Sequence, residues 1–373
     1  MLRASFISGV EKLSRTDPQL VSDTGTWDAD PFLLGTPGKT IDLHTGLARD
    51  PSPRDFITRQ TLVTPVEEAE CPVWTQFLHE TTGADVKFLR FIQQFCGYCL
   101  TGDTSEHALL FIHGPGGNGK SVFIGTLQRI LHDYATTAPM ETFVTSRSDR
   151  HPTELAMLRG ARLVTASETD VNQSFALSKI KQLTGEDMIS ARFMRQDFFT
   201  FRPNFKLVMA GNHKPELGTV DNAIQRRFHL VPFDTKPVHV DRGLEAKLMG
   251  EAPSILRWMI EGCLDWQQNG LIPPAIVRET TLEYFETQDL FGEWLSSETI
   301  LDPKSTALFS PSAQLYSSWS MFAKEAGEDP GSRKALASRL QTLGVRNIQR
   351  RLGNKPTRIW IGISLRNGGP GNV

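Results

Sequence analysis

The sequence has 373 residues, of which 39% are hydrophobic and 22% are charged, with a formal net charge of −2. This composition excludes a disordered chain, and the length is enough for two or three domains with a substantial core. Four cysteines exclude a disulfide framework, no apolar run approaches the ~18 residues of a membrane-spanning helix, and no secretory signal pattern begins the chain. We therefore expect a soluble cytoplasmic protein without a membrane partner.

The near-zero net charge hides an asymmetry along the chain. Residues 331–373 contain nine basic residues and no acidic one, so the first 330 residues carry a net charge of −11. A basic end on an acidic body favours a polyanion held at that end. A solvated basic surface without a partner is the alternative.

The first 105 residues are expected to form an N-terminal α+β domain. Residues 1–65 are rich in Pro, Gly, Thr and Asp, which predicts short strands and turns rather than long helices. Between residues 72 and 100 apolar side chains recur at spacings of three and four, which predicts helices. Cys96 and Cys99 form a C-x-x-C pair inside this pattern with no second ligand pair, so we expect buried core cysteines rather than a zinc or redox site.

The next block, residues 106–240, alternates buried strands with helices. Residues 108–114, 161–167 and 205–211 are strand candidates, and residues 121–135 form an amphipathic helix. This alternation predicts an α/β core with a parallel sheet and helices on its faces. Residues 241–280 are expected to form a helical lid or connector.

A glycine-rich motif lies between the first strand and the helix of this core. It fits the pattern G-x-x-x-x-G-K-[ST] and consists of Gly114, Pro115, Gly116, Gly117, Asn118, Gly119, Lys120 and Ser121. Glycines let backbone N–H groups turn inward around phosphates, and the helix N-terminus adds positive potential. Lys120 can reach the β- and γ-phosphates and the Ser121 hydroxyl can bind Mg²⁺. The motif predicts ATP and Mg²⁺ as cofactors; a purely structural glycine turn is the alternative.

Four further residues are candidates for the chemistry of such a site. Glu168 ends the 161–167 strand and is a candidate base, or a Mg²⁺ ligand beside Ser121; a helix-cap or surface acid is the alternative. Asn212 follows the 205–211 strand, where an amide can orient an attacking water. Arg226 and Arg227 precede an apolar strand, and an arginine there can stabilise transition-state charge in a neighbouring subunit.

Two regions are candidates for binding DNA. A polar turn and an alternating segment predict a hairpin with Arg192 and Arg195, and Lys206 as a third candidate; incidental arginines on an exposed hairpin are the alternative. Residues 281–373 contain helix-like segments and then a hairpin-like stretch, the outline of a winged-helix domain. Lys334 and Arg339 would lie on its recognition helix, and Lys355 near the wing tip.

The sequence resembles the superfamily 3 helicases in the order of its segments GPGGNGKS, RLVTASE, KIKQLTGEDMISAR, FKLVMAGN and QRRF…VPF. The resemblance extends to the phage/plasmid primase-helicase branch, which includes the poxvirus primase-helicase. The segments DADPFLLGTPGKTIDLHTG, CPVWTQFL and FLRFIQQFCGYCLTGD resemble the domain that precedes the motor in that branch, so residues 23–240 are covered. The resemblance implies an AAA+-like P-loop ATPase that forms a ring, usually a homo-hexamer, on single-stranded or forked DNA.

The resemblance also implies roles for individual residues. Lys120 and Ser121 correspond to Walker A, Glu168 to the Walker B acid and Asn212 to the polar sensor. Many relatives have two acids where this chain has one, which leaves Glu168 open as base or metal ligand. Arg227 matches the trans-acting arginine finger better than Arg226. The segment that forms the DNA-facing hairpin contains Lys181, Thr184, Gly185, Asp187 and Arg192.

The sequence therefore predicts an ATP-dependent DNA helicase for phage-, prophage- or plasmid-type replication in a bacterial host. An origin-binding ATPase that does not unwind DNA is the first alternative, and a small-molecule P-loop kinase is the second. Only about twenty residues precede the recognisable region. We therefore expect no primase active site in the chain, and a primase as a separate or fused partner.

Overall fold

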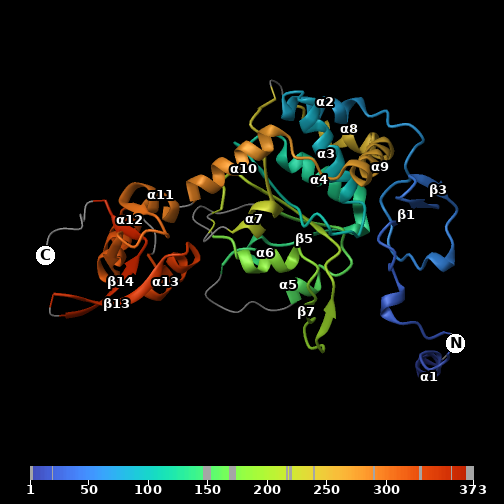
Figure 1. Ribbon diagram of the computed structural model, residues 1–373. Coiled ribbons are helices and arrows are strands. Elements are labelled where there is room, and N and C mark those ends of the chain that lie inside the picture. The colour runs from blue at the N-terminus through green and yellow to red at the C-terminus, as the bar shows by residue number, and fades with distance from the viewer. Residues whose placement is uncertain are drawn as a thin grey trace. The chain divides into compact units, whose positions relative to one another are not determined.

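The computed structural model describes residues 3–18, 20–145, 153–167, 174–215, 217, 221–237, 240–288, 290–326, 330–353 and 355–366. The chain divides into two compact units, Met1–Tyr284 and Phe285–Val373 (Figure 1). None of the helices in these described ranges has the length and hydropathy of a membrane-crossing segment.

The first unit begins with a helix that the sequence pattern did not predict. Helix α1 (Ala4–Ser14) has no buried residue, and an ion pair of 2.6 Å joins Glu11 to Arg15 one turn later. The expected short strands follow as an antiparallel sheet of β1 (Leu33–Thr36), β2 (Lys39–Asp42) and β3 (Leu47–Arg49). The expectation of strands and turns is therefore wrong for residues 4–14 and correct for residues 33–49.

Helices α2 (Pro72–Thr82) and α3 (Val86–Tyr98) confirm the helical pattern of residues 72–100. Helix α3 packs closely on α9 (Ala252–Asn269) through two glycines. A Cβ at Gly97 would lie 2.0 Å from the backbone N of Cys263, and a Cβ at Gly262 would lie 2.1 Å from the carbonyl O of Gln93. Only glycine permits this approach of the two helices.

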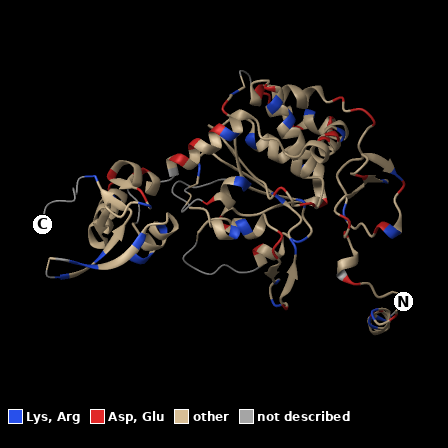
Figure 2. Cartoon of the chain, in the orientation of Figure 1, with Lys and Arg blue, Asp and Glu red and all other residues tan. Residues whose placement is uncertain are grey.

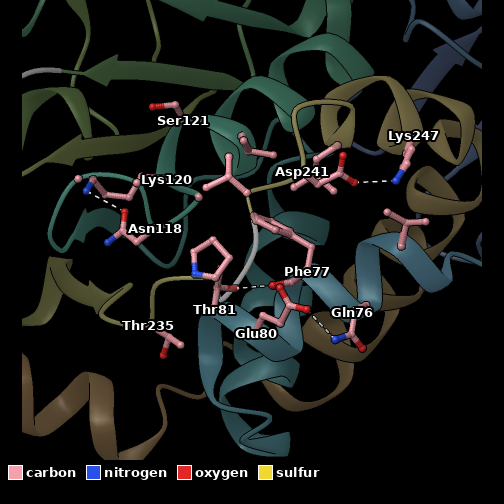
Figure 3. Close-up of a pocket in the computed structure, with 18 of the residues that line it drawn as sticks. Gln76, Phe77, Glu80, Thr81, Asn118, Lys120, Ser121, Thr235, Asp241 and Lys247 are labelled. Carbon is pink, nitrogen blue, oxygen red and sulfur yellow. Dashed lines mark hydrogen bonds and ion pairs between the residues drawn. The ribbon is translucent and has the colours of Figure 1, made fainter.

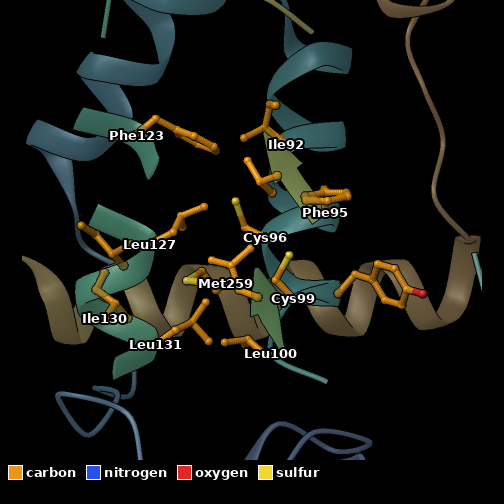
Figure 4. Packing of buried hydrophobic residues seen from close by; sticks show 14 of the residues in the cluster. Ile92, Phe95, Cys96, Cys99, Leu100, Phe123, Leu127, Ile130, Leu131 and Met259 are labelled. Atoms are coloured by element: carbon orange, nitrogen blue, oxygen red, sulfur yellow. The ribbon is translucent and has the colours of Figure 1, made fainter. Parts of the chain in front are cut away.

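The core between α3, α9 and α4 (Lys120–Leu131) contains both residues of the C-x-x-C pair. Cys96 and Cys99 are fully buried and lie among apolar side chains such as Leu127 and Met259 (Figure 4). Burial raises the pKa of both thiols. These cysteines are core residues, as the sequence pattern indicated.

A five-stranded parallel sheet forms the centre of the first unit. Its order is β10-β4-β9-β6-β5, from β4 (Leu109–His113), β5 (Ala135–Thr137), β6 (Leu163–Ser167), β9 (Lys206–Gly211) and β10 (Phe228–Pro232). The register pairs His113 at the end of β4 with Gly211 of β9 and Pro232 of β10. The predicted α/β fold with a parallel sheet is confirmed, and the loops after these three strands meet at one edge.

The remaining elements of the first unit surround this sheet. They are the helices α5 (Thr153–Ala156), α6 (Leu177–Leu183), α7 (Asn222–Arg227) and α8 (Leu244–Gly250), and the strands β7 (Ile189–Ala191) and β8 (Phe199–Phe201). The antiparallel pair β7–β8 is a hairpin that extends away from the sheet (Figure 1). Helix α10 (Ala275–Gln288) reaches the boundary between the units.

The second unit combines three helices with short strands. Its elements are α11 (Leu290–Glu298), β11 (Thr299–Leu301), β12 (Phe309–Pro311), α12 (Ser312–Glu325), α13 (Arg333–Thr342), β13 (Arg346–Leu352), β14 (Lys355–Ile361) and β15 (Ile363–Leu365). One antiparallel sheet has the order β12-β14-β13, and β11 pairs with β15. Trp294, Trp319 and Trp360 lie in the core of this unit.

Candidate functional site

The glycine-rich loop, residues 114–119, joins the carboxyl end of β4 to the first turn of α4. Gly114 has a φ of +153°, and a Cβ there would lie 2.1 Å from the carbonyl O of Phe233. Gly119 has a φ of +87°, and its Cβ would lie 2.7 Å from the ring of Phe77. Both positions combine a positive φ with no room for a side chain, so the path of the loop depends on glycine.

Lys120 lies at the start of α4 with its ammonium group turned back to the loop. Its Nζ donates to the carbonyl O of Gly114 at 2.6 Å and to the Oδ1 atoms of Asn118 and Asn212, both at 3.0 Å. Burial lowers the pKa of Lys120, and the Asp234 carboxylate opposes this shift. The structure thus brings together Lys120 and Asn212, two predicted site residues from different strand ends.

Asn118 connects this lysine to a third strand. Its side chain is 1% exposed; Nδ2 donates to the carbonyl O of Phe233, just after β10, while Oδ1 accepts from Lys120. The sequence pattern includes Asn118 in the loop but gives it no separate role. In the structure it joins the loop, the lysine and the end of β10.

The loop forms one side of a cavity of about 750 Å³ (Figure 3). The other side comes from α2 and from the segment between β10 and α8. Beyond residues 116–122 and Asn212, the cavity is lined by Pro72, Val73, Gln76, Phe77, Glu80, Thr81, Thr235, Pro237, Val240, Asp241, Leu244 and Lys247. These lining residues could not be predicted from the sequence, because the only signal there, the resemblance of CPVWTQFL to a family segment, assigns none of them to a site.

The charged and amide side chains on this second side of the cavity are paired with each other. Gln76 Nε2 donates to Glu80 Oε1 at 2.8 Å, and Lys247 Nζ lies 2.7 Å from Asp241 Oδ2 (Figure 3). The hydrogen bond from Lys247 lowers the pKa of Asp241. These polar lining side chains are therefore held in place by contacts with each other.

The residues present fit a nucleoside triphosphate with Mg²⁺. The loop places glycine where a Cβ would collide, a buried ammonium lies at its end, and the Ser121 side chain lines the same cavity. Cavities of roughly 300–1,000 Å³ hold small ligands. Glu168, the other predicted metal ligand or base, directly follows β6 and lies outside the described residues.

The two arginines predicted to act on a neighbouring subunit lie at the end of α7. Arg226 is exposed, and Arg227 is half-buried with one guanidinium nitrogen donating to the carbonyl O of Ala223 at 2.9 Å. Its buried Nε has no hydrogen-bond partner among the described residues. Neither arginine lines the cavity of its own chain.

Arg192 and Arg195 lie in the loop that joins β7 to β8. The Arg192 guanidinium lies 4.6 Å from the centre of the Phe198 ring, and Arg195 is exposed with a φ of +61°. Phe198 and Met194 of the same loop are 59% and 65% exposed. The hairpin tip therefore presents both cationic and apolar surface.

Two other basic residues lie elsewhere than the sequence pattern suggested. Lys181 is in α6 and forms an ion pair with Asp221. Lys206 is not on the hairpin: it is buried in β9, where its Nζ donates to the carbonyl oxygens of Thr101 and Asp103. Burial lowers the pKa of Lys206 to about 7.

The basic residues of the second unit differ in their surroundings. Lys334 in α13 and Lys355 at the start of β14 are exposed. Arg339 is half-buried, with its guanidinium 5.3 Å from the ring centre of Phe291 and 5.9 Å from that of Trp319. The β13–β14 hairpin carries Lys and Arg and no acidic residue (Figure 2).

Two known families match parts of the chain. The family D5 N terminal like matches residues 2–83, and a family of unknown function, DUF5906, matches residues 112–227. The second match begins within β4 and ends with α7, so it contains the glycine-rich loop, Asn212 and both arginines.

The chain is also similar to several viral proteins. A protein of Acanthamoeba polyphaga mimivirus named as a putative helicase is 25% identical over 72% of this chain and 30% of its own length. A protein of Frog virus 3 with the same kind of name is 24% identical over 62% of this chain and 26% of its own length. Primase D5 of Fowlpox virus is 28% identical over 38% of this chain and 18% of its own length. The chain thus spans less than a third of these relatives.

Solved structures share the fold. An apo structure of the NrS-1 C terminal region has a TM-score of 0.53 at 11% identity and covers 97% of this chain and 90% of that chain. A second structure of that region has a TM-score of 0.50 at 12% identity. These family, sequence and fold matches confirm the resemblance to primase-helicase-like proteins.

Proposed function

We propose that the protein is an ATP-dependent DNA helicase that assembles as a ring, usually a hexamer, and translocates on single-stranded DNA. The observation that carries this proposal is the position of Lys120. Its ammonium lies at the end of the glycine-rich loop, 3.0 Å from the Asn212 amide oxygen and at the edge of a 750 Å³ cavity. The names of the viral relatives support a replicative role.

Each residue of the site has a distinct task in this proposal. Lys120 exchanges its present oxygen partners for oxygens of the β- and γ-phosphates, and the Ser121 hydroxyl holds Mg²⁺. Mg²⁺ neutralises charge on the phosphates when bound. Asn212 orients the attacking water, and Glu168 serves as its base or as a second metal ligand.

Arg227 is proposed to act on the nucleotide of the next subunit, with Arg226 as the second choice. Arg227 does not line the cavity of its own chain, which is compatible with an action on the nucleotide of a neighbouring subunit. A cation placed beside the γ-phosphate stabilises the charge of the transition state. ATP would then be held between two copies of the chain.

Two basic surfaces are proposed to bind DNA. The β7–β8 hairpin offers Arg192 and Arg195 for the backbone of one strand, and Lys181 of α6 is a further candidate contact. In the second unit the order α11, β11, β12, α12, α13 and the β13–β14 hairpin, with sheet order β12-β14-β13, supports a winged-helix-like domain. Lys334 would lie on its recognition helix and Lys355 on its wing, while Arg339 packs on aromatic rings.

The trans-acting role of Arg227 is tested by mixing subunits. Arg227→Ala should bind ATP as the wild type does but hydrolyse it poorly, and added mutant should depress wild-type turnover more than its share of the subunits. Mixing with Arg278→Ala, at an exposed position of α10 outside the proposed site, controls for the loss of one positive charge. Mutant protein that only dilutes wild-type activity contradicts the shared site.

The basic second unit also favours an alternative, an ATPase that binds an origin without unwinding it. A forked duplex with a labelled strand separates the two functions. The helicase releases the labelled strand when ATP is hydrolysed, whereas the initiator binds the fork and leaves the duplex intact.

A further inference from the structure

Helix α10 packs on the edge strand of the central sheet. This strand is β10, the first in the order β10-β4-β9-β6-β5, and the backbone N–H of Leu230 donates to Thr281 Oγ1 of α10 at 2.9 Å. Val277, Thr281 and Tyr284 follow one another at spacings of four and three residues, so they share one face of the helix, and all three are buried. A hydrogen bond and buried side chains therefore fix α10 to β10.

Tyr284 contacts both ends of the connection between β9 and β10, which contains Asn212 and Arg227. At the first end, the Tyr284 hydroxyl donates to the carbonyl O of Pro215. At the second end, the centre of its ring lies 5.8 Å from that of Phe228, the residue directly after Arg227. One buried side chain thus joins α10 to the two segments with proposed catalytic residues.

The hydroxyl contact lies close in the chain to Asn212, whose amide oxygen accepts from Lys120 Nζ at 3.0 Å. Pro215 follows Asn212 by three residues and is buried, and Lys214 between them has its Nζ 5.7 Å from the centre of the Tyr284 ring. Proline also fixes its own φ. The hydrogen bond from Tyr284 therefore restricts the short backbone segment that carries the Asn212 amide.

We propose that Tyr284 is a positioning residue for Asn212. The inference rests on the proposed role of Asn212 in ATP hydrolysis. The Tyr284 hydroxyl holds the segment after β9, and this keeps the Asn212 amide where it orients the attacking water. Because Tyr284 belongs to α10, the position of this amide depends on the helix that leads into the second unit.

Steady-state ATP hydrolysis by the full chain tests this role in Tyr284→Phe, which removes the hydroxyl and keeps the ring that packs on Phe228. The kcat should be about tenfold below that of the wild type, while the KM for Mg²⁺–ATP stays unchanged. Tyr134→Phe is the matched control, because the buried Tyr134 hydroxyl also donates to a carbonyl O, that of Arg59 at 3.0 Å, and Tyr134 does not line the cavity. This control should hydrolyse ATP as the wild type does.

A double-mutant cycle tests whether Tyr284 acts through Asn212. If it does, Tyr284→Phe should lower the kcat no further when Asn212 is already replaced by alanine. Equal fold-losses in the wild-type and Asn212→Ala backgrounds would overturn the positioning role, because a general loss of packing acts in both.

The same measurements separate failure of this inference from failure of the proposed function. A wild type that hydrolyses no ATP refutes the function, and the positioning role with it. If the wild type hydrolyses ATP but Tyr284→Phe keeps the full kcat, only the positioning role is refuted. The same loss of kcat in Tyr134→Phe would also overturn it, because that hydroxyl lies outside the site.

Discussion

Replacing Asn118 by alanine should mainly lower the stability of the protein, whereas replacing Asn212 by alanine should mainly lower ATP turnover. Both amides accept a hydrogen bond from Lys120 Nζ at 3.0 Å. Asn118 is 1% exposed and also donates to the carbonyl O of Phe233, whereas Asn212 is exposed at the tip of β9. The same substitution therefore removes different interactions at the two positions.

The expected magnitudes follow from these contacts. Asn118→Ala removes a buried hydrogen bond to a charged group, worth about 1.5–3 kcal/mol, and leaves the carbonyl O of Phe233 without its donor. The free energy of unfolding should fall by about 2–4 kcal/mol. Asn212→Ala should cost less than about 1 kcal/mol, because water replaces the exposed amide and Lys120 keeps its other acceptors. Its turnover should nevertheless fall by about a hundredfold if the amide orients the attacking water.

Urea unfolding followed by tryptophan fluorescence measures the free energy of unfolding of both variants. Steady-state ATP hydrolysis measures their turnover. We expect a lower urea midpoint for Asn118→Ala at an unchanged slope. Equal stability of the two variants would refute the bridging role of Asn118. Normal turnover by Asn212→Ala would refute its role toward water.

Further perturbations test other parts of the structure. Glu251 accepts hydrogen bonds from two backbone N–H groups at the start of α2, both at 2.9 Å. Glu251→Ala should lower stability by about 1 kcal/mol in urea unfolding through loss of the α2 cap, and Glu251→Gln by less; equal losses would contradict the capping role. Burial lowers the pKa of His229 from 6.5 to about 4. The unfolded chain then binds a proton that the folded chain does not, so stability should fall as the pH drops from 6.5 to 4, and less steeply in His229→Gln. Lys334→Ala and Lys355→Ala should each reduce the slope of log affinity for DNA against log salt by about 1 in binding titrations, and unchanged slopes would exclude phosphate contacts.

Much of the central sheet could be predicted because its strands are short apolar runs buried on both faces. The runs ending at His113, Ser167 and Gly211 all form parallel strands. Helix α1 was missed because the composition of residues 1–65 is dominated by the turn residues that follow it. Helix α1 has no buried residue, so it does not pack an apolar face against the rest of the unit. Such packing is what usually makes a surface helix recognisable from its sequence.

The candidate site was predictable only where backbone geometry demands particular residues. The loop needs glycine at positions 114 and 119, and Asn212 is a polar residue directly after a buried strand, so both left a local signal. The cavity residues from α2 and α8 have no such local signal in the sequence, because only the tertiary packing brings them to the cavity beside the loop. Lys206 was misplaced for a related reason: sequence alternation alone does not reveal that a lysine in a strand is buried and satisfied by carbonyl oxygens.

The most direct test of the proposed motor is ATP hydrolysis with and without single-stranded DNA, measured on size-resolved wild-type protein and on Lys120→Ala. The proposed function predicts that DNA stimulates turnover in a ring-sized fraction and that Lys120→Ala shows none. Turnover by a monomer that is indifferent to DNA, or full turnover by Lys120→Ala, would contradict it.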